Sequence, residues 1–412
     1  MKKLFALFLA CALLCLTACN TNPSPGTETN GSVSSDSAGT DVQLPSASIP
    51  QDVIIAEKNE CFINLPSRVV FESGGKTVYY SKTDGKTYVY CLDPLCNHSD
   101  GKCLAQPTAP DMPGINFTGT KFVNNRFWCT ATFLGKIVSF HFDGTDMKVE
   151  YDAGYQQDQI TWGGDLWNPD IMAYGPYLYL EQNYLASEDG RAHTLRFNTE
   201  TKEMEDLTEK TGNYILPQLF YNGSVYGYNE SFSWCKCSLD LTDVEAIGEI
   251  PVPVYYSGSC IFSATSTGVA VYDMKNGETK AISNSVLGVP EGAEISIQFV
   301  DESYIYYNHS KKEPVGYYPN PKTGKMIVQY RWSDGKLYRA NHDGSNVVCI
   351  YNEPEYEFTA GNLIVFGDKV ISCGQYIGVH NDVVKVWGNG YYVGTIREDG
   401  IIGEFVEVEV LQ

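Results

Sequence analysis

The chain has 412 residues and a formal net charge of −21 at pH 7, and it contains 29 Tyr, 38 Gly and 13 Cys. An acidic surface repels phosphate backbones, so the charge argues against a nucleic-acid partner and against adhesion to an anionic membrane through a basic patch. With 43% hydrophobic and 13% aromatic residues the chain can bury a large core, which excludes wholesale disorder.

The first residues have the pattern of a secretory signal. Lys2 and Lys3 precede an apolar run over residues 4–16, which is too short to span a bilayer core of ~30 Å as a helix. The run leads into Leu-Thr-Ala-Cys at residues 16–19, a motif that resembles the lipobox of bacterial lipoproteins. The resemblance implies a signal peptide over 1–18 and acyl chains, such as palmitate, on Cys19. A plain secretory signal cut after Ala18 is the alternative.

The next segment reads as a tether. Residues 20–51 are dominated by Ser, Thr, Asn, Pro and Gly and contain no aromatic residue, so we expect a disordered linker over 19–51, beginning at the lipidated Cys19. No second hydrophobic stretch approaches transmembrane length. We therefore expect the remainder, residues 52–412, on the extracytoplasmic face of a membrane in the bacterial cell envelope.

A degenerate repeat begins near residue 52. Short runs of Tyr, Val, Ile and Phe alternate with turns that contain Asp or Asn, and the turns from Asp84 to Asp399 recur on average every ~52 residues. A period of about 40–50 residues with about four strands per unit is typical of a β-propeller, in which neighbouring sheets cover each other's apolar faces. The sequence thus predicts an all-β propeller over 52–412 with seven blades, six or eight being the alternatives. The turns are Asp84-Gly85, Asp143-Gly144, 198–202, 240–243, 273–277, Asp343-Gly344 and Asp399-Gly400.

Two segments of this domain carry further expectations. The unit around residues 308–332 contains Pro314, Pro319 and Pro321 and predicts a long inserted loop, whereas residues 404–410 predict a half-buried strand that closes the ring. The run His-Asp-Gly-Ser-Asn at 342–346 is similar to the hairpins of TolB-type propellers. Together, lipobox, tether and propeller resemble a group of bacterial surface lipoproteins without an assigned function.

A cysteine cluster follows the outer strand of the first blade. Cys91, Cys96, His98 and Cys103 lie within 13 residues, and three thiolates with one imidazole suit a closed, structural Zn²⁺ site. Disulfides, one of them to Cys61, and unpaired thiols are the alternatives, because an exported chain can oxidise. The other cysteines of the domain lie in strand-like runs and are expected to be buried thiols.

The connection between Tyr151 and Tyr177 is the candidate ligand site. Aromatic side chains beside carboxylates suit a sugar-binding cleft, because ring faces stack on sugars and Asp accepts hydroxyl hydrogen bonds. Asp165 and Asp170 could instead act as the acid and base of a glycosidase, or the aromatic side chains could simply pack the connection onto a blade. The candidate ligand-binding residues are Tyr155, Trp162, Trp167, Tyr174 and Tyr177.

These patterns favour one function over two others. No catalytic motif occurs, and the histidines of the domain outside the cysteine cluster are scattered, so we expect a lipid-anchored propeller that binds a glycan or protein partner without catalysis. The first alternative is a surface carbohydrate-active hydrolase or lyase. The second is a metal- or redox-handling lipoprotein that uses the cysteine cluster.

Overall fold

The structure is a computed structural model. Residues 44–412 form one compact unit. Within it the structure describes residues 55–56, 62–65, 67–73, 76–91, 96, 120–124, 126–132, 134–141, 146–155, 167, 171–184, 187, 189–248, 250–252, 254–380 and 383–411. The predicted signal peptide, Cys19 and the whole predicted tether lie outside these ranges.

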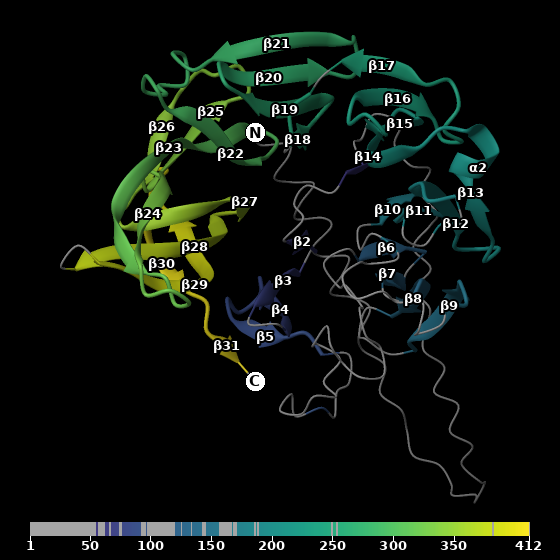
Figure 1. Cartoon of the computed structure of the whole chain (residues 1–412), viewed down its shortest axis with the longest axis horizontal. Helices are drawn as coiled ribbons and strands as arrows, with labels where there is room; N and C mark the ends of the chain where they lie inside the picture. The colour runs from purple at the N-terminus through teal and green to yellow at the C-terminus, as the bar shows by residue number, and fades with distance from the viewer. Residues whose placement is uncertain are drawn as a thin grey trace, which may run out of the picture. The chain divides into compact units, whose positions relative to one another are not determined.

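Seven blades of antiparallel strands form a β-propeller, which confirms the predicted fold class and blade number, and one parallel pairing joins blades 6 and 7 into a single sheet (Figure 1). Each blade consists of four strands. Their order along the sequence is also their order in the blade, so the first strand is the innermost and the fourth is the outermost. Blade 1 contains β2 (Ile63–Asn64), β3 (Arg68–Ser73), β4 (Lys76–Ser81) and β5 (Thr87–Val89). Blade 2 contains β6 (Lys121–Val123), β7 (Arg126–Ala131), β8 (Lys136–Phe140) and β9 (Lys148–Asp152). Blade 3 contains β10 (Met172–Tyr174), β11 (Tyr177–Gln182), β12 (His193–Asn198) and β13 (Met204–Asp206).

The remaining blades follow the same order. Blade 4 contains β14 (Ile215–Tyr221), β15 (Ser224–Asn229), β16 (Trp234–Ser238) and β17 (Glu245–Gly248). Blade 5 contains β18 (Val254–Ser257), β19 (Cys260–Thr265), β20 (Gly268–Asp273) and β21 (Glu278–Ser283). Blade 6 contains β22 (Glu294–Val300), β23 (Tyr304–Pro319), β25 (Lys336–Asn341) and β26 (Val348–Asn352). Blade 7 contains β27 (Tyr356–Phe366), β28 (Lys369–His380), β29 (Val383–Ile396) and β30 (Ile402–Glu407).

Six of the seven turns read from the sequence lie between the third and fourth strands of a blade, and the seventh, Asp143-Gly144, lies outside the described residues. For example, the Asp84-Gly85 turn lies between β4 and β5, and the Asp343-Gly344 turn lies between β25 and β26. Gly344 has a φ of 83°, and a Cβ there would lie 2.5 Å from Ile282 of the neighbouring blade. A glycine is therefore needed at this position for both its backbone conformation and its size.

The apolar faces of neighbouring blades pack against each other, as the sequence of the strands predicts. In β23 the side chains of Ile305 and Tyr307 join one buried cluster, whereas Tyr306 between them joins another. This strand therefore contributes to two interfaces. The first and last blades meet in the larger of these clusters, where the rings of Phe71 in blade 1 and Tyr391 in blade 7 have centroids 4.5 Å apart.

Strand direction separates the connections into two faces of the ring. Because strands alternate in direction, the connections between the second and third strands and between blades share one face, which we call the insertion face. The opposite face, here called the turn face, carries the two other turns of each blade. Every connection longer than seven residues between the strands given above belongs to the insertion face, and the longest are 90–120, 153–171, 183–192, 207–214, 284–293 and 320–335.

The predicted loop over residues 308–332 is wrong, because the structure forms a hairpin there. β23 continues to Pro319 and pairs with β24 (Met326–Ser333), so the hairpin projects from the insertion face of blade 6. The strand tolerates Pro314 because the register shifts between Pro314 and Gly316, and Pro319 lies at its end. One pairing, Tyr317 with Val383, joins this hairpin to β29 of blade 7.

The two ends of the domain add short strands to other blades. β31 (Val410–Leu411) pairs in parallel with β5, so it extends the outer edge of blade 1 and closes the ring. Most of the predicted closing strand instead belongs to β30 of blade 7, and only its last residue takes part in closure. At the other end, β1 (Ile55–Ala56) pairs with β14, the innermost strand of blade 4.

Within the described part of the chain, no helix has the length and apolar character needed to cross a membrane.

Candidate functional site

The predicted zinc cluster is only partly within the described residues. Cys91 follows β5 and is half-buried, as is Cys96, but His98 and Cys103 lie outside the described ranges. Among the residues that the structure describes, no group of three His, Cys, Asp or Glu side chains could hold a metal ion. The Zn²⁺ site therefore stays a prediction.

Other thiols of the domain are poor metal ligands or redox groups. Cys129, Cys235 and Cys237 are at most 3% exposed, as expected for buried thiols, whereas Cys260, Cys349 and Cys373 are half-buried and depart from that expectation. Burial raises the pKa of Cys129 and Cys237 to about 12 and that of Cys235 to about 11. Because the thiolate is the reactive form, these side chains are inert at neutral pH.

Trp167, which lies in the predicted connection between Tyr151 and Tyr177, is a core residue. Its side chain is 1% exposed and its ring stacks on Tyr151 at 6.0 Å, so packing is the role that the structure describes for it. Tyr155 is half-buried, and its hydroxyl accepts a hydrogen bond from Gln182 Nε2 at 2.8 Å. Trp162, Asp165 and Asp170 lie outside the described residues.

Tyr174 and Tyr177 belong to strands rather than to the connection. Tyr174 ends β10 and packs on Phe220 of blade 4, with ring centroids 5.0 Å apart. Tyr177 begins β11, and the guanidinium of Arg196 lies 4.8 Å from its ring centroid. Both rings are half-buried between neighbouring side chains, so neither presents a fully open ring face.

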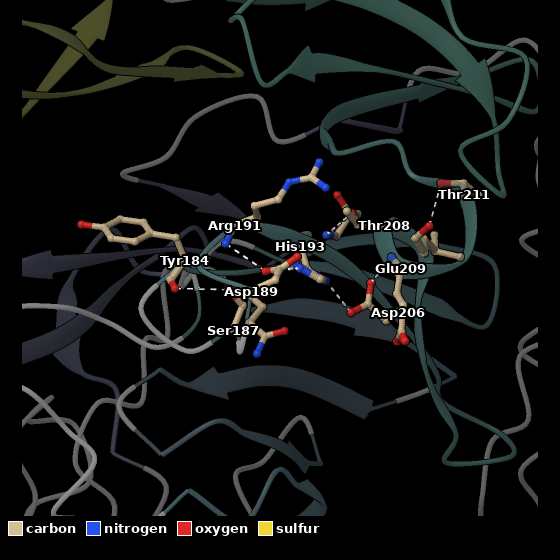
Figure 2. Close-up of polar contacts among 12 residues, drawn as sticks. Tyr184, Ser187, Asp189, Arg191, His193, Asp206, Thr208, Glu209 and Thr211 are labelled. Atoms are coloured by element: carbon tan, nitrogen blue, oxygen red, sulfur yellow. Dashed lines mark hydrogen bonds and ion pairs between the residues drawn. The ribbon is translucent and has the colours of Figure 1, made fainter.

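A polar cluster on blade 3 lies at the insertion face, where His193 joins two elements (Figure 2). His193 Nδ1 is 2.6 Å from Asp206 Oδ2, and Nε2 is 3.0 Å from Asp189 Oδ1. Asp189 lies in the 183–192 connection and also accepts the backbone N–H of Arg191 at 2.9 Å. The imidazole, only 12% exposed, thus links that connection to the end of β13.

Asp206 is also the N-cap residue of the short helix α2 (Leu207–Thr211). Its Oδ1 accepts the backbone N–H of Glu209 at 2.8 Å, which caps the helix, and Gly212 ends the helix with a φ of 77°. Asp followed three residues later by Glu is a recognised sequence signal for a helix start. That signal could have located α2, which the sequence analysis missed.

The geometry of His193 suits an ionic link better than catalysis. A carboxylate can only accept hydrogen bonds, so both ring nitrogens must carry protons for both contacts to form. Burial lowers the pKa of His193, but the contacts with Asp206 and Asp189 outweigh burial and hold that pKa above its usual value. The ring therefore has no lone pair directed at a substrate, as a general base requires.

The face of β24 is the most exposed apolar surface of the hairpin. Met326, Val328, Tyr330 and Trp332 alternate along the strand and are 53%, 38%, 37% and 53% exposed. Tyr317 pairs with Val328, which places it on the same face, and it is 49% exposed. The period of two from Met326 to Trp332 was a strand signal in the sequence that the prolines obscured.

The base of the hairpin is fixed to blade 7. The backbone N–H of Trp332 donates to Glu357 Oε1 at 3.1 Å, and Arg331 Nη1 donates to the carbonyl of Pro354. Glu357 is 7% exposed, and burial raises the pKa of its carboxyl despite the hydrogen bonds that it accepts. These contacts hold β24 in a defined position while its outer face stays exposed.

No protein-family profile matches the sequence, and no curated protein is significantly similar to it. Among solved structures, an oligogalacturonate lyase from Vibrio parahaemolyticus is 12% identical, with 85% of this chain and 93% of the lyase covered and a TM-score of 0.44. PorZ, a surface component of the type-IX secretion system of Porphyromonas gingivalis, is 11% identical, with 85% of this chain and 52% of PorZ covered and a TM-score of 0.36. The extracellular domain of a one-component system from B. thetaiotaomicron is 11% identical. The match covers 82% of this chain and 39% of that chain, with a TM-score of 0.38. All three are similar to this chain in fold alone.

Proposed function

We propose that this protein is a lipid-anchored propeller of the bacterial cell envelope that binds an extracytoplasmic ligand or partner through its insertion face. One observation carries the proposal: the long connections and the projecting hairpin all belong to that face, whereas the turn face has only short turns. Long connections on a rigid scaffold are where binding residues concentrate. The lipobox supports the anchor, and the engaged nitrogens of His193 support binding rather than catalysis.

The anchor has a direct test in Cys19→Ser. Expressed with its signal sequence in a bacterial host, the parent chain should incorporate radiolabelled palmitate and sediment with membranes, and the variant should do neither, because the acylated thiol is gone. Cys260→Ser, which changes a half-buried strand thiol, should behave as the parent chain. Membrane sedimentation of unlabelled Cys19→Ser would contradict the lipid anchor.

The binding face can be located by hydrogen exchange. The mature domain is first screened by thermal shift against neutral and acidic polysaccharides and peptides, and any compound that raises the melting temperature is used as the probe. We expect protection in insertion-face segments such as 183–192, 207–214 and the β23–β24 hairpin. Protection confined to turn-face turns such as 274–277 would overturn the proposal, and so would release of reducing ends from a bound polysaccharide, which would show an enzyme.

A further inference from the structure

The β23–β24 hairpin combines exposed ring faces with positive charge, and we infer that it binds an acidic polysaccharide whose sugar units carry carboxylates. This inference rests on the proposed function and deepens it, because it names one part of the insertion face and one class of ligand. It depends on the exposure of the β24 face, on the charge of the hairpin and on the rigidity of its base.

The exposed apolar side chains of the domain gather on this hairpin. Of the sixteen large hydrophobic residues that are exposed in the described ranges, five lie on one face of β23 and β24, and Trp332 is the single Trp among the sixteen. Same-face neighbours along a strand are ~6.6–6.8 Å apart, so the side chains form an extended strip. Such a strip suits a polymer chain better than a small molecule, which needs a concave pocket.

The charge of the hairpin is opposite to that of the chain. Residues 304–333 contain five Lys or Arg and one acidic residue, Glu313, whereas the whole chain has a net charge of −21. Glu313 lies 3.6 Å from Lys311 and 3.9 Å from Arg331. Within the described residues, no carboxylate lies within ion-pair distance of Lys312, so its ammonium group is available to an acidic ligand.

The ammonium group of Lys312 lies close to the aromatic rings of β24. Lys312 Nζ lies 4.2 Å from the ring centroid of Tyr330 and 5.4 Å from that of Trp332. A sugar ring stacked on Tyr330 or Trp332 through its C–H face would bring a carboxylate substituent within reach of Lys312. The ring face and the carboxylate of an acidic sugar could thus both be bound at this one site.

Two other occupants fit less well. A second copy of this chain would place one basic hairpin against another, and like charges at a contact disfavour the pairing. An acidic peptide could add to β24, which pairs only with β23 among the described strands, but that contact uses the backbone edge and leaves the ring faces unused. The exposed rings therefore favour the polysaccharide.

The test uses the mature protein in affinity electrophoresis with polygalacturonate, alginate and methyl-esterified polygalacturonate as probes. The parent protein should be retarded by the two acidic polymers, and less by the ester, which has the same backbone without charge. Tyr330→Ala and Trp332→Ala should each weaken binding about tenfold, because each substitution removes an aromatic ring on which a sugar would stack. Lys312→Gln should weaken binding to the acidic polymers and leave binding to the ester unchanged.

Matched variants separate this inference from the proposed function. Phe232→Ala removes an aromatic ring that is 86% exposed on the insertion face of blade 4, and Lys275→Gln removes a cation of the turn face, so both should bind as the parent does. Equal binding by the parent and the three hairpin variants would overturn the hairpin site while leaving a binding propeller intact. Polyglutamate serves as a further probe, an acidic polymer without sugar rings. Retardation by polyglutamate alone, or by no polymer, would overturn the acidic polysaccharide as ligand. Circular dichroism and the melting temperature show that each variant is folded.

Discussion

At the scale of single residues, His193 shows how a polar group is accommodated near the surface of a blade. Its ring is 12% exposed, and a carboxylate lies at each nitrogen. The pH dependence of the folding stability follows from the sign of the pKa shift of His193. A pKa that is higher in the folded than in the unfolded chain adds stability below the unfolded value of ~6.5, and this stability is lost as the pH rises through the folded value.

We therefore expect His193→Gln to reduce the free energy of unfolding by about 1.5–3 kcal/mol at pH 5.5, the range for hydrogen bonds to charged groups. At pH 8.5 the difference from the parent chain should be smaller, because the contribution of the imidazolium is lost as the pH rises through the folded pKa. Urea unfolding at the two pH values measures this. His342→Gln, which changes a histidine facing the carbonyl of Asp301, is the control. An equal loss at both pH values would contradict the ionic link.

The contacts of His193 could not be predicted from the sequence. Its partners lie 4 and 13 residues away, and the nearer one is brought back by a turn within a connection. The farther one is placed by the register of β12 and β13, in which Leu195 pairs with Asp206. The register of two strands depends on the packing of the whole blade, so no local sequence pattern predicts it.

At the scale of elements, α2 depends on one carboxylate with two roles. Oδ1 of Asp206 caps the helix, and Oδ2 contacts His193. Asn keeps an acceptor oxygen for the cap but carries no charge, whereas Ala removes both functions. The two substitutions therefore separate capping from ion pairing.

Asp206→Ala should lower the free energy of unfolding by about 1 kcal/mol at pH 8.5, the usual value of a lost cap, and by more at pH 5.5. Asp206→Asn should unfold like the parent chain at pH 8.5 and be destabilised only at pH 5.5, where His193 is charged. Chemical denaturation of the three proteins side by side gives the comparison. If Asn and Ala were indistinguishable at both pH values, the cap would contribute nothing.

The elements differ in how well the sequence predicted them. The Asx turns were predictable because a tight turn is determined by a few adjacent residues such as Asp343 and Gly344. The β23–β24 hairpin was not, because Pro314 and Pro319 are typical of loops. They are tolerated in the structure by a register shift and by a strand end, which are features of pairing rather than of composition.

At the scale of the whole molecule, seven turns predicted seven blades, but the closure of the ring differs from the expectation. The alternation over residues 404–410 does indicate strands, yet Phe405 is buried against β29 in blade 7, whereas Val410 pairs with Thr87 of blade 1. Alternation identifies a strand without naming its neighbour. The choice of neighbour comes from the packing of the first blade against the last.

Deleting residues 410–412 should lower the free energy of unfolding by about 2 kcal/mol, since the β31–β5 pairing and the packing of Val410 on the core between the first and last blades are lost. Thermal and urea unfolding report the loss. Val406→Ala, at a position that is 62% exposed, is the control and should change stability by less than about 0.5 kcal/mol. A truncated chain as stable as the parent would show that β31 does not close the ring.

The way in which the blades are built has a consequence for engineering. Each blade uses four strands from one stretch of chain, so a cut between blades, for example at residues 250–252 between blades 4 and 5, leaves all seven blades whole. In blade 1, β31 lies four strand spacings from β2, which is ~19 Å, a gap that a short linker can span. Circular permutants that begin at successive connections between blades would therefore rotate the point of attachment around the ring and open one insertion-face connection at a time, while the strands of every blade stay intact. With such a series, the orientation in which this domain is presented becomes an adjustable variable.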